Sequence, residues 1–317
     1  MINVSVIIPC YNVEQYISEC LDTVFGQDLP PLEVICVDDG SSDHTVDVLQ
    51  TYKLLYPEKL HILFNEGNKG ATYSRNRGLV MAKGEYLNFF DADDLMLSLK
   101  LKHQTQLLDQ LKSKPDILVS SCIKRYIDGT EKKYVYKEQN HWNALMNAVL
   151  GVTTSNLFKK TKVLEVKGWS EQLKSSQEYD LMFRMLQAGA TVHFDTTVVC
   201  LNRERASGSI SKTNPKEKWR RYIDLRIRIY EHLKTSGNLT PEIEQTFVNV
   251  LFNAIRIYYK YDRSEAVKLH EKYIKSVRMP SLTDAITAKY LRVYRLFGFD
   301  VAQKMSELMS SQSKAIH

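Results

Sequence analysis

The chain has 317 residues, of which 44% are hydrophobic and 25% charged, and its net charge is +6. This composition is typical of a globular protein with one large domain or two smaller ones. No run of eighteen apolar residues occurs, which argues against a membrane-spanning helix. The charge is uneven, because residues 214–317 hold 19 Lys and Arg against 11 Asp and Glu, a net +8, and the remainder is −2.

The N-terminal stretch "MINVSVIIPCYN" is apolar but has no basic segment before it, so it predicts a first strand rather than a secretion signal. The five cysteines form no C-x-x-C pair. Reduced thiols in a cytosolic protein fit this pattern better than a cysteine-based metal site. We therefore expect a cytoplasmic location.

Strand and helix patterns alternate along the first third of the chain. Strands are expected at 4–9, 32–40, 60–64 and 86–90. Helices are expected at 14–27, 44–56 and 71–82, with Asp43 as the N-cap of the second. This alternation predicts βαβ units and a largely parallel sheet, in which ligands bind at the carboxyl ends of the strands. The polar segments "PCYN", "DDGSSD", "NEGNKG" and "DADD" lie at those ends.

After residue 101 the pattern is less regular. A helix is expected at 99–112, strands near 116–121 and 132–136, an apolar segment at 153–158, and a helix at 177–189. From residue 215 onward nearly every segment predicts a helix, with breaks at 236–242, 261–264 and 278–284. The predicted fold class is therefore α/β, a mostly parallel sheet flanked by helices, followed by a helical region that begins near 210–215.

The segment "YLNFFDADDL" places three carboxylates directly after a predicted strand. Asp91 and Asp93 are two residues apart, so in extended backbone both side chains point the same way, with Asp94 beside them. Two carboxylates together with phosphate oxygens suit Mg²⁺ or Mn²⁺. A simple turn or a helix cap is the alternative interpretation of this pattern.

Two further loops carry candidate binding residues. Asp38 and Asp39 in "VDDGSSD" are either the acids of an Asx turn or acceptors for a base or a ribose. Arg75 follows the glycine-bearing turn of "NEGNKGATYSRNRG", where a guanidinium can hold a diphosphate. The spacing matches neither the dinucleotide-binding nor the P-loop fingerprint, which argues against a dehydrogenase or a P-loop enzyme.

Taken together, these segments resemble the inverting glycosyltransferases of family 2. The resemblance rests on "VSVIIPCYNVEQYI", "VDDGSSD", "NKGATYSRNRG", "GEYLNFFDADD" and "GWSEQLKSSQEYDLMFR", and covers roughly residues 3–212. It implies a GT-A fold, with a catalytic domain at 1–213 and a helical region at 214–317. It also implies Mn²⁺ or Mg²⁺ as cofactor, and transfer of a sugar from a UDP-sugar to a glycan or lipid-linked hydroxyl in cell-surface polysaccharide synthesis.

The resemblance also implies roles for individual residues. Asp39 would accept a hydrogen bond from uracil N3, Asp38 would support its loop, and Arg75 would lie near the diphosphate. Asp91 would contact the ribose or the metal, and Asp93 would bind the metal. The residues expected to line the nucleobase pocket are Pro9, Tyr11 and Glu14, with Tyr11 stacking on the base.

The family's usual acidic pair falls on Gln177 and Glu178, which is a departure because Gln177 is neutral. Glu178 remains a carboxylate and is the expected general base. Asp180 is the rival base, although its spacing to Arg184 favours an i,i+4 ion pair inside the helix.

Three more residues are expected around the acceptor and the diphosphate. Trp169 matches an aromatic position that borders the acceptor in many family members. The segment 201–211 lacks the histidine that some members place after the last strand. Arg203 or Arg205 would instead close over the diphosphate, with Gly208 as hinge, unless this is an ordinary basic surface loop.

The C-terminal helices interleave basic and apolar residues, as in "RRYIDLRIRIYEHL" and "AKYLRVYRLFGF". Docking on the catalytic domain, a homo-oligomer contact or an anionic membrane surface each fit this pattern. No nucleic-acid-binding motif accompanies the charge. Two other functions stay open from the sequence: a sugar nucleotidyltransferase, and a non-catalytic partner with the same fold.

Overall fold

The computed structural model describes residues 2–137, 139–205, 214–283 and 285–314, with side chains as far as residue 308. The chain divides into two compact units, Met1–Ser209 and Ile210–His317. Each unit is described by itself below.

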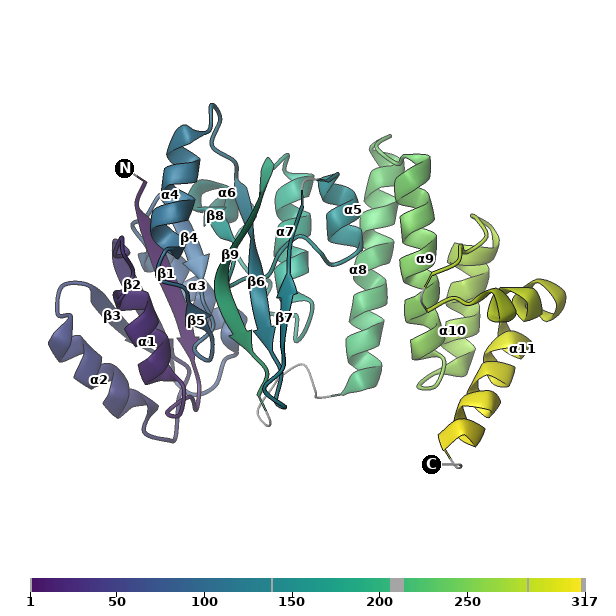
Figure 1. The fold of residues 1–317 in the computed structure, drawn as a ribbon, viewed down its shortest axis with the longest axis horizontal. Helices are drawn as coiled ribbons and strands as arrows, with labels where there is room; N and C mark the ends of the chain where they lie inside the picture. Colours follow the sequence, from purple (N-terminus) through teal and green to yellow (C-terminus); the bar gives the residue numbers. More distant parts are fainter. Residues whose placement is uncertain (1, 138, 206–213, 284, 315–317) are drawn as a thin grey trace. The chain divides into compact units, whose positions relative to one another are not determined.

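The first unit begins with four parallel strands in the spatial order β3-β2-β1-β4. These are β1 (Val4–Cys10), β2 (Glu33–Asp38), β3 (Leu60–Phe64) and β4 (Tyr86–Phe89). The connecting helices are α1 (Ile17–Phe25), α2 (Thr45–Leu55) and α3 (Ala71–Met81). Every residue of β2 and β4 is buried, as expected for apolar runs covered on both faces. The predicted βαβ pattern is confirmed over this region (Figure 1).

The second half of the sheet is mixed, in the order β4-β8-β6-β9-β5, with β7 paired to β6. Its strands are β5 (Leu95–Met96), β6 (Ile117–Arg125), β7 (Glu131–Tyr134), β8 (Leu157–Lys159) and β9 (Val192–Arg203). Its helices are α4 (Lys100–Gln110), α5 (His141–Met146), α6 (Lys160–Glu165) and α7 (Gln177–Gln187). β8 is antiparallel to both its neighbours, whereas β6 and β9 are parallel. The predicted α/β class is confirmed.

Two local predictions are corrected. The residue before α2 is His44, not Asp43, although the Asp43 carboxylate accepts from the Thr45 N–H at 3.0 Å and so still serves the helix start. β9 continues to Arg203, so this arginine belongs to a strand rather than to the following loop. The long pairing of β9 with β6 extends the strand that far.

The second unit is helical over its described residues. It contains α8 (Pro215–Thr235), α9 (Pro241–Tyr258), α10 (Arg263–His270), the π-helical segment η2 (Glu271–Lys275) and α11 (Ala288–Lys314). Gly298, with φ 78° and ψ 178°, interrupts α11, and Figure 1 shows the two helical segments on either side of this kink. Within the described residues, no helix has the length and apolar content needed to cross a membrane.

Candidate active site

The loops after β1, β2 and β4 meet at one edge of the sheet, because these strands are parallel and in register. Cys10 pairs with Asp38, and Ile7 with Phe89, so the strand ends lie side by side. The polar segments found in the sequence therefore converge in space, as predicted for a site at the carboxyl ends of the strands.

The loops after β1 and β2 hold each other in place. Asn12, in left-handed backbone with φ 49°, accepts from the Ser42 N–H at 2.9 Å through its side-chain oxygen. Glu14 accepts from the His44 N–H at 2.8 Å and so ties the first loop to the start of α2. Pro9 lies partly buried in β1, and the Tyr11 side chain is 44% exposed, so its ring is available for stacking.

Asp38 and Asp39 are both buried and shape the neighbouring loops. One oxygen of Asp38 accepts from the N–H groups of Gly40 and Ser41 at 3.1 and 3.2 Å, and these two hydrogen bonds hold the start of the loop after β2. Its other oxygen is buried without a partner among the described residues. Asp39 accepts three hydrogen bonds, from the Asn65 side chain and from the N–H groups of Lys69 and Gly70, at 2.6, 2.9 and 2.7 Å.

Arg75 joins three segments of the site. Its guanidinium donates to an Asp91 carboxylate oxygen at 2.7 Å and lies 3.5 Å from the side-chain oxygen of Gln177. It also lies over the Trp169 ring, 4.7 Å from the ring centroid. Trp169 is only 2% exposed and packs edge-on against Phe89 at 5.0 Å, so here the indole supports Arg75, and its contact with an acceptor stays a prediction.

The three clustered aspartates face different partners. Asp91 pairs with Arg75, and Asp93 forms an ion pair with Arg205. Asp94 is 4% exposed and accepts from the Asn202 side chain and from the backbone N–H of Arg203, the latter at 2.9 Å. Asp91 and Asp93 are therefore each paired with an arginine, whereas Asp94 is hydrogen-bonded to a side-chain amide and a backbone N–H.

Burial raises the pKa of the Asp93 carboxyl, and the nearby Asp91 charge adds to this effect. The pKa of Asp94 lies well above its usual value, first because of burial and then because of the neighbouring aspartates. A cation placed at this cluster would lower these pKa values, so the electrostatics favour positive charge here.

Asp91 and Asp93 fit a divalent cation by their chemistry. Both are hard oxygen donors, and Asp91 is 39% exposed, whereas both oxygens of Asp94 are already occupied. The described residues contain no group of three or more His, Cys, Asp or Glu side chains able to hold a metal ion. Mg²⁺ and Mn²⁺ sites that keep waters and phosphate oxygens need only one or two carboxylates from the protein.

Arg203 and Arg205 both contact Asp93. The Arg203 guanidinium contacts the Asp93 carbonyl oxygen and the Glu19 carboxylate, and both arginines lie over the Tyr16 ring, at 5.3 and 5.0 Å from its centroid. The predicted hinge, Gly208, lies outside the described residues.

Glu178 occupies the first turn of α7 and accepts from the Thr153 hydroxyl at 2.7 Å. Burial raises its pKa above the usual value, and the Asp91 charge adds to this, while the Thr153 hydrogen bond and the Arg75 charge act in the opposite direction. Asp91 and Arg75 therefore lie close enough to Glu178 for their charges to affect its pKa, and the three residues belong to one candidate site. A partly buried carboxylate with a raised pKa is suited to accept a proton.

Asp180, the rival base, is 3% exposed and pairs with Arg184 at 2.8 Å, so the predicted i,i+4 pair is confirmed. Arg184 also donates to the carbonyl oxygens of Val166 and Gly168 at 2.6 and 2.7 Å. Asp180 thus neutralises an arginine that anchors the preceding loop.

Two residues of the site were not found from the sequence. Thr153, which holds Glu178, lies in the segment "TTSN", and Asn202, which holds Asp94, lies in β9. The available signal was a run of four polar residues at 153–156 and, for Asn202, a polar residue at the end of an apolar strand.

Comparison with known proteins gives the family context. The family model described as glycosyl transferase family 2 matches residues 5–168. A putative teichuronic acid biosynthesis glycosyltransferase, TuaG of Bacillus subtilis, is 34% identical over 154 residues, covering 48% of this chain and 60% of the relative. The chain spans 36, 63 and 60% of the lengths of the first curated relatives it matches.

Two solved structures show the same fold. S. aureus TarS 1–349, in complex with UDP-GlcNAc, matches with a TM-score of 0.72 and 20% identity, covering 98% of this chain and 92% of that structure. The mannosyltransferase PcManGT of Pyrobaculum calidifontis, in complex with GDP-Man and Mn²⁺, matches with a TM-score of 0.53 and 18% identity, covering 97% and 87%. These similarities confirm the predicted GT-A fold.

Proposed function

The chain belongs to glycosyl transferase family 2, and from this premise we propose that it is an inverting glycosyltransferase. Its donor is a nucleotide-sugar, specifically a UDP-sugar. Its acceptor is a hydroxyl group of a glycan or a lipid-linked sugar, and its product belongs to a cell-surface polysaccharide. The observation that carries the proposal is Glu178, a carboxylate with a raised pKa held by Thr153 beside the Asp91–Arg75 pair.

In this reaction Glu178 takes the proton of the acceptor hydroxyl as its oxygen attacks the anomeric carbon from the side opposite the diphosphate. The bond between the sugar and the diphosphate breaks, and its electron pair leaves with the nucleoside diphosphate. One attack on the opposite face inverts the anomeric configuration.

The donor site is assigned to the loops after β1 and β2. The exposed Tyr11 ring stacks on the base, and Pro9 and Glu14 border it. A carboxylate has about four acceptor positions, so Asp39, which accepts three hydrogen bonds in this structure, retains one for uracil N3. The unpartnered oxygen of Asp38 offers a second acceptor nearby.

Asp91 and Asp93 are the residues that would hold Mn²⁺ or Mg²⁺. When bound, the cation supplies positive charge against the leaving diphosphate. Arg75, which pairs with Asp91, would also stabilise the negative charge of the diphosphate. In this structure Arg205 forms an ion pair with Asp93. Binding of a cation at Asp93 therefore competes with the Asp93–Arg205 ion pair.

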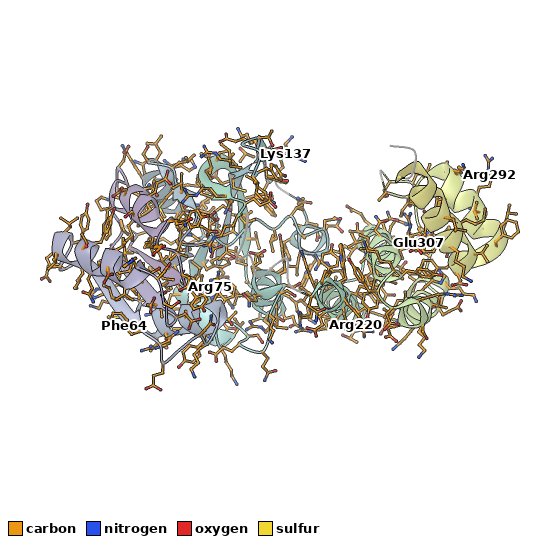
Figure 2. The ribbon with its side chains drawn as sticks, turned by 90° about the horizontal axis from the view of Figure 1, so that it is seen from below. Phe64, Arg75, Lys137, Arg220, Arg292 and Glu307 are labelled. Atoms are coloured by element: carbon orange, nitrogen blue, oxygen red, sulfur yellow. The ribbon has the colours of Figure 1, made fainter. Side chains whose placement is uncertain are left out.

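We assign contact with an anionic membrane surface, where lipid-linked acceptors lie, to the kink of α11. Leu296 and Phe297 are 70% and 61% exposed immediately before Gly298. Arg292, labelled in Figure 2, and Arg295 are exposed on the same short segment. Apolar side chains flanked by arginines are the pattern of a segment that enters the headgroup region. Location in the cytoplasm stays a prediction.

The test is nucleotide release from a panel of UDP-sugars and GDP-mannose by the full chain, with and without Mn²⁺ and with a glycan acceptor preparation. Acceptor-dependent release of a nucleoside diphosphate supports the proposal. Pyrophosphate exchange with UTP would instead indicate a nucleotidyltransferase. If UDP and every donor also fail to raise the melting temperature in Mn²⁺, the chain is a non-catalytic member of its family.

A further inference from the structure

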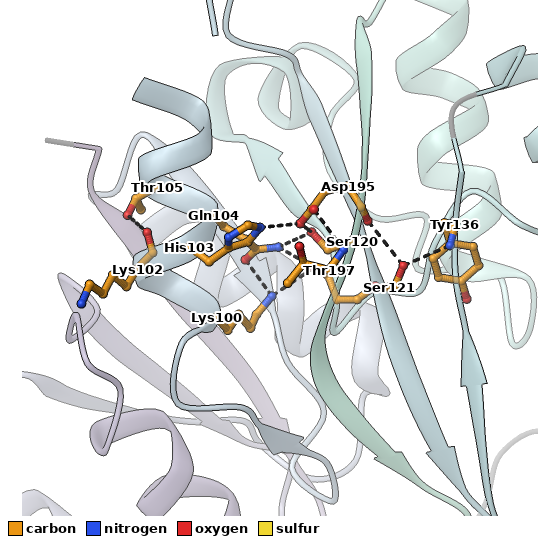
Figure 3. Close-up of polar contacts among 11 residues, drawn as sticks. Lys100, Lys102, His103, Gln104, Thr105, Ser120, Ser121, Tyr136, Asp195 and Thr197 are labelled. Atoms are coloured by element: carbon orange, nitrogen blue, oxygen red, sulfur yellow. Dashed lines mark hydrogen bonds and ion pairs between the residues drawn. The ribbon is translucent and has the colours of Figure 1, made fainter. Parts of the chain in front are cut away.

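A chain of buried hydrogen bonds joins α4 to the segment that holds Glu178. Its centre is Lys100, the first residue of α4, which is 1% exposed. The Lys100 ammonium donates to the side-chain oxygen of Gln104 at 2.9 Å (Figure 3). It also donates to the Ser155 carbonyl at 3.0 Å. The Gln104 amide donates to the same Ser155 carbonyl at 2.9 Å.

Both acceptors of Lys100 are neutral, which is unusual for a buried ammonium. Burial lowers the pKa of Lys100 to about 8, and Cys200 and Asp195 act in the opposite direction. A lysine that only filled the core would be better replaced by an apolar residue of similar size. The free-energy cost of burying this ammonium group therefore suggests that its hydrogen bond to the Ser155 carbonyl has a function.

The segment 153–156 is almost completely enclosed, with exposed fractions between 0 and 3%. Its carbonyl oxygens are held from two sides. Lys100 and Gln104 bind Ser155, while the Asn88 amide donates to Thr154 and Asn156 at 3.1 and 2.9 Å. Only Thr153, at the end of the segment, reaches the proposed base, through its 2.7 Å hydrogen bond to Glu178.

We propose that Lys100 is a positioning residue for the transfer reaction, because it anchors the Ser155 carbonyl and so fixes the Thr153 hydroxyl that orients the Glu178 carboxylate. This inference rests on the proposed function. It extends the working parts of the site to α4, which none of the sequence motifs reaches.

Charged groups lie at both ends of the hydrogen-bond chain, near Gln104 and near Glu178. On the far side, Gln104 donates to the Ser120 hydroxyl at 2.8 Å, which donates to Asp195 at 3.0 Å, and His103 lies 3.0 Å from the same carboxylate oxygen (Figure 3). At the other end Glu178 faces the charges of Asp91 and Arg75.

The experiment compares Lys100→Met, Thr153→Val and the double variant in the full chain, using acceptor-dependent UDP release over a range of pH. Lys100→Met should lower kcat about tenfold and leave the donor KM and UDP binding unchanged. The acid limb of kcat/KM should move to higher pH, because the Thr153 hydrogen bond lowers the pKa of Glu178 and that bond is weakened. In the Thr153→Val background, Lys100→Met should have almost no further effect on kcat.

Lys102→Met is the matched control, because Lys102 is exposed on the same helix and its side chain points away from Gln104 in Figure 3. It should behave like the wild type. If Lys100→Met fails to fold, Gln104→Leu removes the other donor to the Ser155 carbonyl and should shift the pH profile in the same direction.

Three results overturn the inference. In the first, Lys100→Met lowers the melting temperature but leaves the pH profile of kcat/KM unchanged, which would mean that Lys100 has a purely structural role. The effects of the two substitutions on kcat could multiply, which means independent roles. Finally, a wild-type chain without transferase activity removes the proposed function itself, and this outcome is recognised before any variant is measured.

Discussion

Replacing Glu178 with Gln tests the proposed base most directly. The amide is almost isosteric and still accepts from the Thr153 hydroxyl, which lies 2.7 Å from the carboxylate in the wild type. It cannot take a proton from the acceptor. Loss of a general base typically lowers kcat by about 10²- to 10⁴-fold, equivalent to about 2.7–5.4 kcal/mol of barrier. UDP affinity should stay at the wild-type value, because no donor contact is assigned to Glu178.

The same substitution should affect stability with a defined pH dependence. The pKa of Glu178 is raised in the folded state, so its favourable contribution to folding is complete below the unfolded pKa and is lost as pH rises through the folded value. Glu178→Gln removes this loss. Its melting temperature should exceed that of the wild type at pH 7, and the difference should disappear toward about pH 4.

The paired variant Asp180→Asn should show the opposite behaviour. It leaves Arg184 without its 2.8 Å charge partner. We expect a loss of about 2–3 kcal/mol, less than for a fully buried pair, because Arg184 stays partly exposed and keeps two carbonyl acceptors. Calorimetry and UDP release on both variants decide the assignment. If Asp180→Asn abolishes turnover in a stable protein while Glu178→Gln remains active, Asp180 is the base and our reasoning is wrong.

Three further outcomes are expected. Asp93→Ala should abolish the Mn²⁺-dependent part of UDP binding in calorimetric titration with a normal circular dichroism spectrum, and an unchanged affinity in Mn²⁺ would exclude Asp93 as a ligand. Tyr11→Ala should weaken UDP binding about 5- to 160-fold through lost base stacking, a range taken from the 1–3 kcal/mol typical of such contacts; equal affinity would mean that the ring does not contact the base. Serine at both Leu296 and Phe297 should reduce flotation with anionic liposomes, and wild-type binding should fall as salt rises; equal binding to neutral and anionic liposomes would count against the membrane contact.

Local patterns in the sequence were sufficient for the parallel half of the sheet. Short apolar runs alternated with helical spacing, and each run ended in polar residues, so the strands and the edge that carries the site could both be predicted. The Asp180–Arg184 pair was also predictable, because residues four apart face each other on a helix. These features depend only on neighbours within one element or one βαβ unit.

The tertiary structure alone decided which polar groups meet. Thr153 and Glu178 are 25 residues apart, and Asp94 and Asn202 are 108 apart, so no local periodicity relates them. Their contacts depend on the order in which β8, β6 and β9 join the sheet, and two of those strand pairings use only two residues of β8. Lys100 illustrates the same limit, because a lysine in the first turn of a helix predicts an exposed charge, and only the packing of α4 against the segment 153–156 buries it.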